Sequence, residues 1–331
     1  MRVLSRHGAS VTSQKPSRAR ASRFPAVVCM AAVLLICLYS AYAIHRLMAS
    51  SALVPPPPVT FTLGTAYRDV TYCNSQTLDV YVPSSAATRP LPLAIFVHGG
   101  GLTVGDKANL NPTFLNALAR AGFAVASLNY RLAAASLNYR LAPGNQFPAQ
   151  IEDVKCGIRY LRAHAQRYDI NPSKIFAFGT SYGGTLVALA ALTGGHSHFD
   201  VGPYATTSSA IRAAVDMFGP ADLARWISPQ YFHIVFGGNR ANLVLASPAH
   251  YVKANAPPIL IVQGTADVKV PASQSAELYQ KLSAYGDQTQ LVLVHHMGHM
   301  FAQVDPQPIG QSLTQIAADM VSWFKRYGAG P

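Results

Sequence analysis

Short apolar runs alternate with amphipathic stretches along the chain from about residue 59 onward. Residues 93–98 (LAIFVH) form an almost continuous apolar run, which is typical of a central strand covered on both faces. Comparable runs predict further strands over residues 77–82, 123–128, 175–179, 213–218, 259–263 and 290–294. The amphipathic stretches predict helices over residues 111–121, 148–165, 183–192, 272–284 and 309–327. Such alternation predicts an α/β fold with a mainly parallel sheet and helices on both faces.

One segment of the pattern is duplicated. Residues 126–134 (ASLNYRLAA) are followed at once by residues 135–143 (ASLNYRLAP), and eight of the nine positions are identical. Two copies of so short a unit do not make a repeat protein. Only one copy can form the strand that enters from Phe123, and a shift of nine residues would exchange the two faces of that strand. We expect the first copy in the strand and the second copy in the connection to the next helix, near the edge of the site.

The N-terminal part of the chain has a different pattern. We divide it into a basic segment over residues 1–23, an apolar segment over residues 24–45 and a proline-rich linker over residues 46–60. About 20 apolar residues cross a bilayer, and basic residues favour the cytoplasmic side. We therefore expect a transmembrane signal anchor that leaves the domain over residues 61–329 outside the cytoplasm. A cleaved signal peptide is the alternative, because Ala41-Tyr42-Ala43 resembles a cleavage site.

Composition fits this division. The chain has 331 residues, of which 50% are hydrophobic and 12% are charged, so it can form a large core. Seven of its basic residues lie within the first 46 positions, where no acidic residue occurs, and this leaves +5 of the net +12 for the rest. We find no basic stripe interleaved with aromatic residues, and we therefore do not expect a nucleic-acid partner.

Two cysteines lie in the expected catalytic domain, Cys73 and Cys156. In an oxidising compartment they could form a disulfide. Two buried free thiols are the alternative that the sequence leaves open.

The glycine-flanked Ser181 is the candidate nucleophile. It lies in Gly179-Thr180-Ser181-Tyr182-Gly183, between a predicted strand and a predicted helix. This G-x-S-x-G pattern is typical of the strained turn that exposes a nucleophilic serine. A glycine-rich turn with an incidental serine is the alternative, and the strand–turn–helix context argues against it.

A second glycine-rich stretch, His98-Gly99-Gly100-Gly101, follows the central apolar run. The backbone N–H groups of Gly100, Gly101 and Tyr182 are the candidate oxyanion hole, which stabilises a developing negative charge. We expect His98 to orient this loop by hydrogen bonds rather than to act as a base.

Asp267 and His299 complete a candidate triad. Asp267 follows a predicted strand, which places it at the carboxyl edge of the sheet, and its rivals are Asp216 and Asp305. His299 follows the last predicted strand, and its neighbours His295 and His296 also suggest a metal site. The H-x-x-x-H spacing lies at a strand end with no acidic ligand adjacent, so we expect no metal site.

Taken in chain order, these motifs resemble the α/β-hydrolase superfamily. More narrowly they resemble the bacterial carboxylesterases related to hormone-sensitive lipase and to the feruloyl-esterase-like (BD-FAE) group. The likeness also includes residues 138–143 (NYRLAP) and Phe147-Pro148 leading into Asp153. It implies an eight-stranded α/β-hydrolase fold and a serine esterase that uses Ser181, Asp267 and His299 on a small-molecule ester, with no metal or cofactor.

We therefore predict that the protein hydrolyses short- to medium-chain acyl esters. Two other functions are alternatives to this prediction. A serine peptidase of the prolyl-oligopeptidase kind shares the fold, and a non-catalytic binding protein could use the same scaffold. Residues 220–258, with Trp226 and Tyr231, form either a partial cap over the site or a plain surface excursion. The sequence does not determine the oligomeric state.

Overall fold

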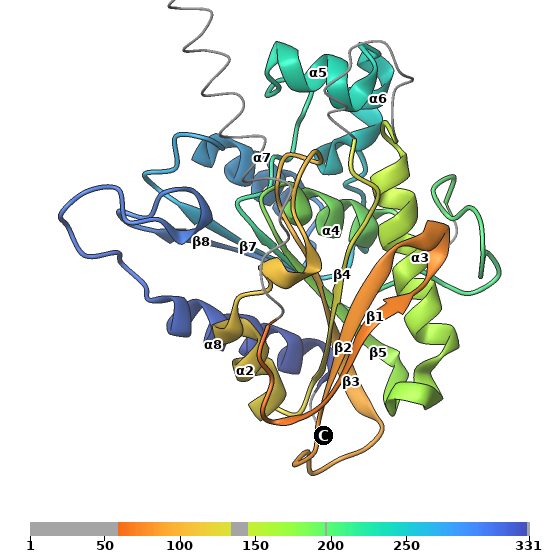
Figure 1. Ribbon diagram of the computed structural model, residues 1–331. Coiled ribbons are helices and arrows are strands. Elements are labelled where there is room, and N and C mark those ends of the chain that lie inside the picture. The colour runs from red at the N-terminus through yellow and green to blue at the C-terminus, as the bar shows by residue number, and fades with distance from the viewer. Residues whose placement is uncertain (1–58, 134–144, 196, 330–331) are drawn as a thin grey trace, which may run out of the picture. The chain divides into compact units, whose positions relative to one another are not determined.

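The computed structural model describes residues 59–133, 145–195 and 197–329. Eight strands in this part of the chain form one sheet in the order β1-β2-β4-β3-β5-β6-β7-β8 (Figure 1). Both pairings of β2, with β1 and with β4, are antiparallel, and all other neighbours are parallel. The predicted α/β fold with a mainly parallel sheet is confirmed. The strands are β1 Gly64–Thr71, β2 Thr77–Pro83, β3 Leu91–Val97, β4 Ala124–Leu128, β5 Ile170–Thr180, β6 Ala214–Met217, β7 Ile259–Gly264 and β8 Thr289–Val294.

Seven of these strands coincide with predicted ones, and β1 is the strand that the pattern did not locate. Its residues are only half-buried or exposed, so it carries no apolar run to mark it. Strand β5 begins at Ile170, five residues before its predicted start, because the half-buried or exposed residues 171–174 (NPSK) separate the buried Ile170 from the apolar run.

Five of the α-helices lie at predicted positions, one with a corrected start, whereas α5 and α6 lie in residues 220–258, where no helix was predicted. The predicted helix over residues 309–327 begins only at Leu313, because Ser312 and Gln315 form a reciprocal capping box, and its α-helical part ends at Phe324. The α-helices are α2 Pro112–Arg120, α3 Ala149–Ala163, α4 Tyr182–Leu192, α5 Pro229–Phe236, α6 Arg240–Ala246, α7 Ala272–Ala284 and α8 Leu313–Phe324. Shorter turns are η1 Cys73–Ser75, η2 Lys107–Asn109, η3 Ala165–Tyr168, η4 Pro248–His250, η5 His299–Phe301 and the π-turn η6 Lys325–Ala329.

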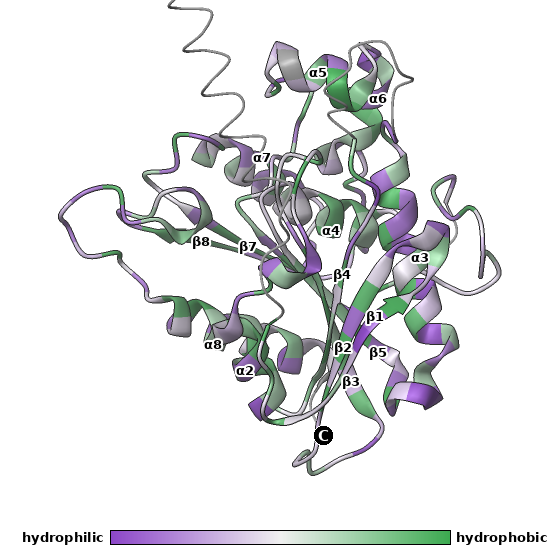
Figure 2. Ribbon diagram, in the orientation of Figure 1, coloured by the Kyte–Doolittle hydropathy of each residue, from purple (hydrophilic) through white to green (hydrophobic). Residues whose placement is uncertain are grey.

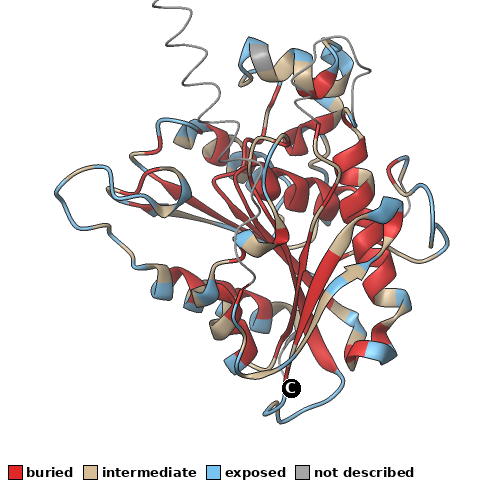
Figure 3. Ribbon diagram, viewed as in Figure 1, coloured by how far each residue is buried: buried red, intermediate tan, exposed pale blue. Residues whose placement is uncertain are grey.

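The two faces of the sheet pack against different helices. Along β3, Leu93, Ile95 and Val97 point to a core shared with α3, α4 and α7, while Ala94 and Phe96 point to a core shared with α2 and α8. This alternation follows from the twofold period of a strand. The apolar strands are buried between the helical layers (Figures 2 and 3). The carboxyl ends of the parallel strands are thereby held at one rigid edge.

The first copy of the duplicated segment forms the strand, as predicted. Residues 126–128 belong to β4. The next residue, Asn129, accepts a hydrogen bond from the backbone N–H of Lys107, and the Tyr130 hydroxyl donates to the carbonyl of His98. Arg131 donates to the buried Asp153 through both its backbone N–H and its Nε. The second copy lies outside the described residues, so its predicted place in the connection is not tested.

The predicted membrane segment over residues 24–45 also lies outside the described residues. Among the helices that the structure does describe, none has the length and apolar character needed to cross a membrane.

Cys73 and Cys156 form a disulfide, with their Cα atoms 6.2 Å apart. It joins η1, at the edge of the sheet, to α3, and it closes a loop with a sequence separation of 83 residues. A cross-link over so long a loop restricts the unfolded chain strongly.

Replacing both cysteines by serine should lower the free energy of unfolding by about 2–4 kcal/mol, because the unfolded chain regains this loop entropy. Urea unfolding of the oxidised wild type and the double variant measures the difference. A difference below about 0.5 kcal/mol would show that the disulfide contributes little.

Removal of one copy of the duplication should leave the protein folded. The Asn145 amide donates to the Leu132 carbonyl at 3.4 Å, so the two ends of the intervening segment are already adjacent. Deleting residues 126–134 or 135–143 yields nearly the same sequence, and one copy supplies all the contacts described above. We expect the free energy of unfolding to change by about 1 kcal/mol or less, since loop closure depends only weakly on length. Loss of cooperative unfolding in the deletion variant would mean that the second copy has a structural role.

Candidate active site

Ser181 lies at the turn where β5 ends and α4 begins. Its backbone has φ 54° and ψ −130°, a combination that is unfavourable for a residue with a side chain. The turn is held from two sides. The Ser181 N–H donates to the Met217 carbonyl at 2.9 Å, and a side chain at Gly183 would lie 2.1 Å from the Val97 carbonyl oxygen. Close packing of α4 on the sheet therefore requires glycine at position 183 and lifts Ser181 to the carboxyl edge.

The structure brings Ser181, His299 and Asp267 together in one chain of hydrogen bonds. The Ser181 Oγ lies 3.0 Å from His299 Nε2, and His299 Nδ1 lies 2.7 Å from Asp267 Oδ2. Asp267 and Ser181 are buried, and the side chain of His299 is 14% exposed. These distances allow a proton to pass from the serine to the imidazole while the carboxylate fixes the ring.

Asp267 is held as an anion by several donors. Its Oδ1 accepts hydrogen bonds from the backbone N–H groups of Lys269 and Val270. Burial alone would raise the pKa of this carboxyl, but the hydrogen bonds from His299 and from Val270 hold it below its ordinary value. Gln263, which the sequence analysis did not single out, also donates to Asp267 Oδ2 at 3.3 Å. The signal that could have identified it is a polar residue at the end of an apolar strand.

The glycine-rich stretch after β3 lies against the serine. A methyl group at Gly99 would be 3.1 Å from Ser181 Cβ, and Gly100 and Gly101 have φ values of 112° and 63° that favour glycine. Tyr182 is the first residue of α4, so its N–H has no partner within the helix. The three candidate oxyanion-hole residues therefore lie in the segments that flank Ser181.

His98 orients the loop, as predicted. Its ring stacks on Tyr130 with centroids 4.3 Å apart, and its Nδ1 donates to the Gly99 carbonyl at 2.7 Å. Burial lowers the pKa of His98 to about 4, so the ring is neutral near pH 7.

Aromatic side chains from residues 220–258 pack beside Tyr182, the residue that follows Ser181. The Tyr182 ring is 6.2 Å from the rings of both Trp226 and Tyr231. Tyr231, on α5, also covers the glycine-rich loop after β3, because a methyl group at Gly101 would lie 2.7 Å from its hydroxyl oxygen. This segment is therefore a partial cap over the site rather than a plain surface excursion.

The rival acids and histidines have other partners. His296 Nδ1 pairs with Asp305 Oδ2 at 3.1 Å on the surface. Asp216 Oδ1 accepts from the Gly219 N–H at 2.9 Å beneath α4, and its Oδ2 has no partner among the described residues. Within the described ranges, no group of three or more histidine, cysteine, aspartate or glutamate side chains is placed to hold a metal ion.

A mainly parallel sheet with a serine at its strand-to-helix turn, followed along the chain by an aspartate and a histidine at the same edge, defines an α/β-hydrolase. The sequence model of the BD-FAE family matches residues 78–282. The chain belongs to this family.

Curated and solved relatives agree with this assignment. Esterase LipC of Mycobacterium tuberculosis (strain ATCC 25618 / H37Rv) is 28% identical over 255 residues, which are 73% of this chain and 61% of the relative. Esterase LipQ of the same organism is 28% identical over 261 residues, 75% of this chain and 59% of the relative. A truncated carbohydrate esterase from gut microbiota is 31% identical with a TM-score of 0.68, covering 82% of this chain and 98% of that chain. The chain thus spans about three fifths of the length of the two curated relatives, and these findings support a carboxylic ester hydrolase.

Asp216 should make stability depend on pH. Burial raises its pKa in the folded protein to about 7, against about 3.9 for an unfolded carboxyl. Between these values the unfolded chain binds fewer protons than the folded one, so the free energy of unfolding falls as the pH rises toward 7 and is then constant. Asp216→Asn removes this titration.

As the pH rises from 5 to 8, the free energy of unfolding of Asp216→Asn, measured relative to wild type, should therefore increase by on the order of 2 kcal/mol. Urea unfolding of both proteins across this range measures the gain, and titrations common to both cancel. A stability difference that does not vary with pH would be inconsistent with a buried neutral carboxyl.

Proposed function

We propose that this protein is a serine carboxylesterase that hydrolyses short- to medium-chain acyl esters through an acyl-enzyme intermediate. The observation that carries the proposal is the unbroken hydrogen-bonded chain from Ser181 through His299 to Asp267. The names of the relatives, two esterases and a carbohydrate esterase, support the same reaction class.

In the first half of the reaction, Ser181 Oγ attacks the ester carbonyl while His299 Nε2 takes its proton. Asp267 keeps the Nδ1–H of the ring pointed away from the serine and stabilises the imidazolium that forms. The negative charge on the carbonyl oxygen is then bound by backbone N–H groups of Gly100, Gly101 and Tyr182. Collapse of this intermediate releases the alcohol, which receives the proton from His299, and leaves the acyl group on Ser181.

In the second half, water repeats the sequence of proton transfers. His299 takes a proton from the water, whose oxygen attacks the acyl carbon, and the same N–H groups bind the oxyanion. Release of the acid returns the proton to Ser181 Oγ. The chemistry needs only side chains and backbone groups of this chain.

We propose that the partial cap formed by residues 220–258 limits the length of the acyl group. The rings of Trp226 and Tyr231 pack near the ring of Tyr182, the residue after Ser181, and we propose that these bulky groups favour small acyl groups over long chains. Rates on p-nitrophenyl acetate, butyrate and octanoate would test this limit.

For localisation, we propose that residues 24–45 carry the catalytic domain across the membrane and remain as its anchor. Carbonate extraction of cell membranes and N-terminal sequencing of the mature protein test this. A protein that is washed off by carbonate or that begins after Ala43 would overturn the anchor in favour of a cleaved signal peptide.

Ser181→Ala in the full chain should lower kcat on p-nitrophenyl butyrate by at least about 10⁴-fold, because the attacking atom is lost. The matched control is Ser173→Ala at the exposed amino end of the same strand, which should retain wild-type activity. A folded wild type that hydrolyses none of the esters would instead favour a peptidase or a binding protein on this scaffold.

Asp267→Asn should lower kcat by roughly 10²–10⁴-fold while leaving KM nearly unchanged, since the amide favours the wrong tautomer of His299 but does not bind the substrate. Steady-state kinetics on the same ester provide the measurement. Wild-type turnover in this variant would exclude Asp267 from the triad and would make Asp216 the candidate acid instead.

A further inference from the structure

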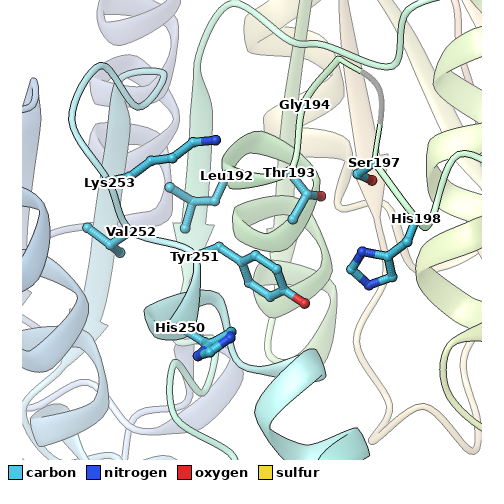
Figure 4. A pocket seen from close by; sticks show the side chains of 9 residues that line it. All are labelled: Leu192, Thr193, Gly194, Ser197, His198, His250, Tyr251, Val252 and Lys253. Atoms are coloured by element: carbon cyan, nitrogen blue, oxygen red, sulfur yellow. The ribbon is translucent and has the colours of Figure 1, made fainter.

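A cavity lies at the opposite end of α4 from the candidate nucleophile. Ser181 precedes the first residue of this helix, whereas the cavity begins at its last residue, Leu192, about 15 Å along the helix. The cavity has a volume of about 330 Å³ and lies between the residues that follow α4 and those that follow η4 (Figure 4). This volume is within the range of small-molecule sites, roughly 300–1,000 Å³.

The lining of this cavity is basic. His198, His250 and Lys253 are all exposed at its rim, and none of the nine described residues that line it is acidic. Among the described residues, these three side chains form no ion pair, although most other charged groups nearby are paired. Figure 4 shows the Lys253 chain and the His198 ring on opposite sides of Tyr251. The rim therefore carries one lysine and two hydrogen-bonding imidazole rings, arranged around Tyr251.

The floor of the cavity covers a buried excess of positive charge. Lys155 and Arg159, both on α3, share a single carboxylate, Asp200, at 2.9 and 2.7 Å. The side chains of the two bases are fully buried, and that of Asp200 is 3% exposed. Lys155 Nζ also donates to Thr193 and Ser197, two residues that line the cavity. The cluster thus carries a net charge of +1 directly beneath the cavity.

Such an excess is costly in a protein interior, where charges are normally balanced. Carbonyl oxygens of Thr193 and Val201 accept hydrogen bonds from the two bases but carry no net charge. The partial negative charge at the carboxyl end of α4 offsets only part of the imbalance. In keeping with this, burial and the neighbouring Arg159 lower the pKa of Lys155 even though Asp200 is adjacent. Arg159 Nε is buried with no partner among the described residues.

We propose that this cavity binds a small anion, a phosphate or a carboxylate carried on a group the size of a monosaccharide. Lys253 and the two rim histidines would contact the anionic group, and the buried Lys155–Arg159–Asp200 cluster would add long-range attraction through the floor. The volume exceeds what a bare phosphate fills, so the anion should be one end of a larger molecule. The proposal does not rest on ester hydrolysis, because the cavity and the nucleophile lie at opposite ends of α4.

The test is calorimetric titration of the full chain at fixed ionic strength with four probes: inorganic phosphate, glucose 6-phosphate, glucuronate and uncharged glucose. We expect saturable binding of the three anions and not of glucose. Tighter binding of glucose 6-phosphate or glucuronate than of phosphate would support a sugar-linked anion, whereas equal binding of phosphate, or no saturable binding of any anion, would contradict the proposal. Glucose binding as tightly as glucose 6-phosphate would overturn the proposal.

Lys253→Glu should weaken anion binding by at least about tenfold, since it replaces an attraction at short range by a repulsion. The matched control is Lys325→Glu, which makes the same charge change at an exposed lysine of η6 and should leave Kd within about twofold. Equal Kd values in the two variants would mean that only net charge matters and that no site exists. Both variants change surface residues, so both should fold, and their melting temperatures without anion check this.

Discussion

The close approach of α4 to the sheet is the constraint on which the site depends. Glycine at position 183 lets the helix begin against the carbonyl of Val97, and this forces Ser181 into a backbone conformation with positive φ. Such strain costs about 1–3 kcal/mol and persists only where the surroundings fix it. Here β3, β5 and β6 all contribute, because Ser181 is anchored to Met217 as well. The same packing brings both the start of α4 and the glycine-rich loop after β3 next to Ser181.

Two buried aspartates show how the environment separates charge states at this edge. Hydrogen bonds from several donors lower the pKa of the Asp267 carboxyl below its ordinary value. Burial with a single donor instead raises the pKa of Asp216 to about 7. The carboxyl group that faces His299 is therefore the charged one, and the one beneath the helix is neutral below pH 7. In the proposed mechanism, this division leaves a single carboxylate to act on the imidazole, with no competing negative charge beneath the candidate nucleophile.

Most of the fold and of the candidate site could be predicted because each depended on a local signal. Apolar runs identified the buried strands, and the glycine patterns located Ser181 and the oxyanion loop at element ends. The half-buried β1 has no such signal, and Gln263 becomes relevant only when β7 brings it beside Asp267. The charge imbalance of Lys155, Arg159 and Asp200 is likewise invisible in the sequence, since the three residues meet only through the packing of α3 against the chain that follows α4.

The most direct test of the central claim is to find the residue that reacts. The full chain would be treated with a fluorophosphonate probe, digested and analysed by mass spectrometry, in parallel with the loss of esterase activity. We predict one adduct per chain, on the peptide that contains Ser181, forming at the same rate as activity is lost. An adduct on another serine, or complete loss of activity with Ser181 unmodified, would contradict it.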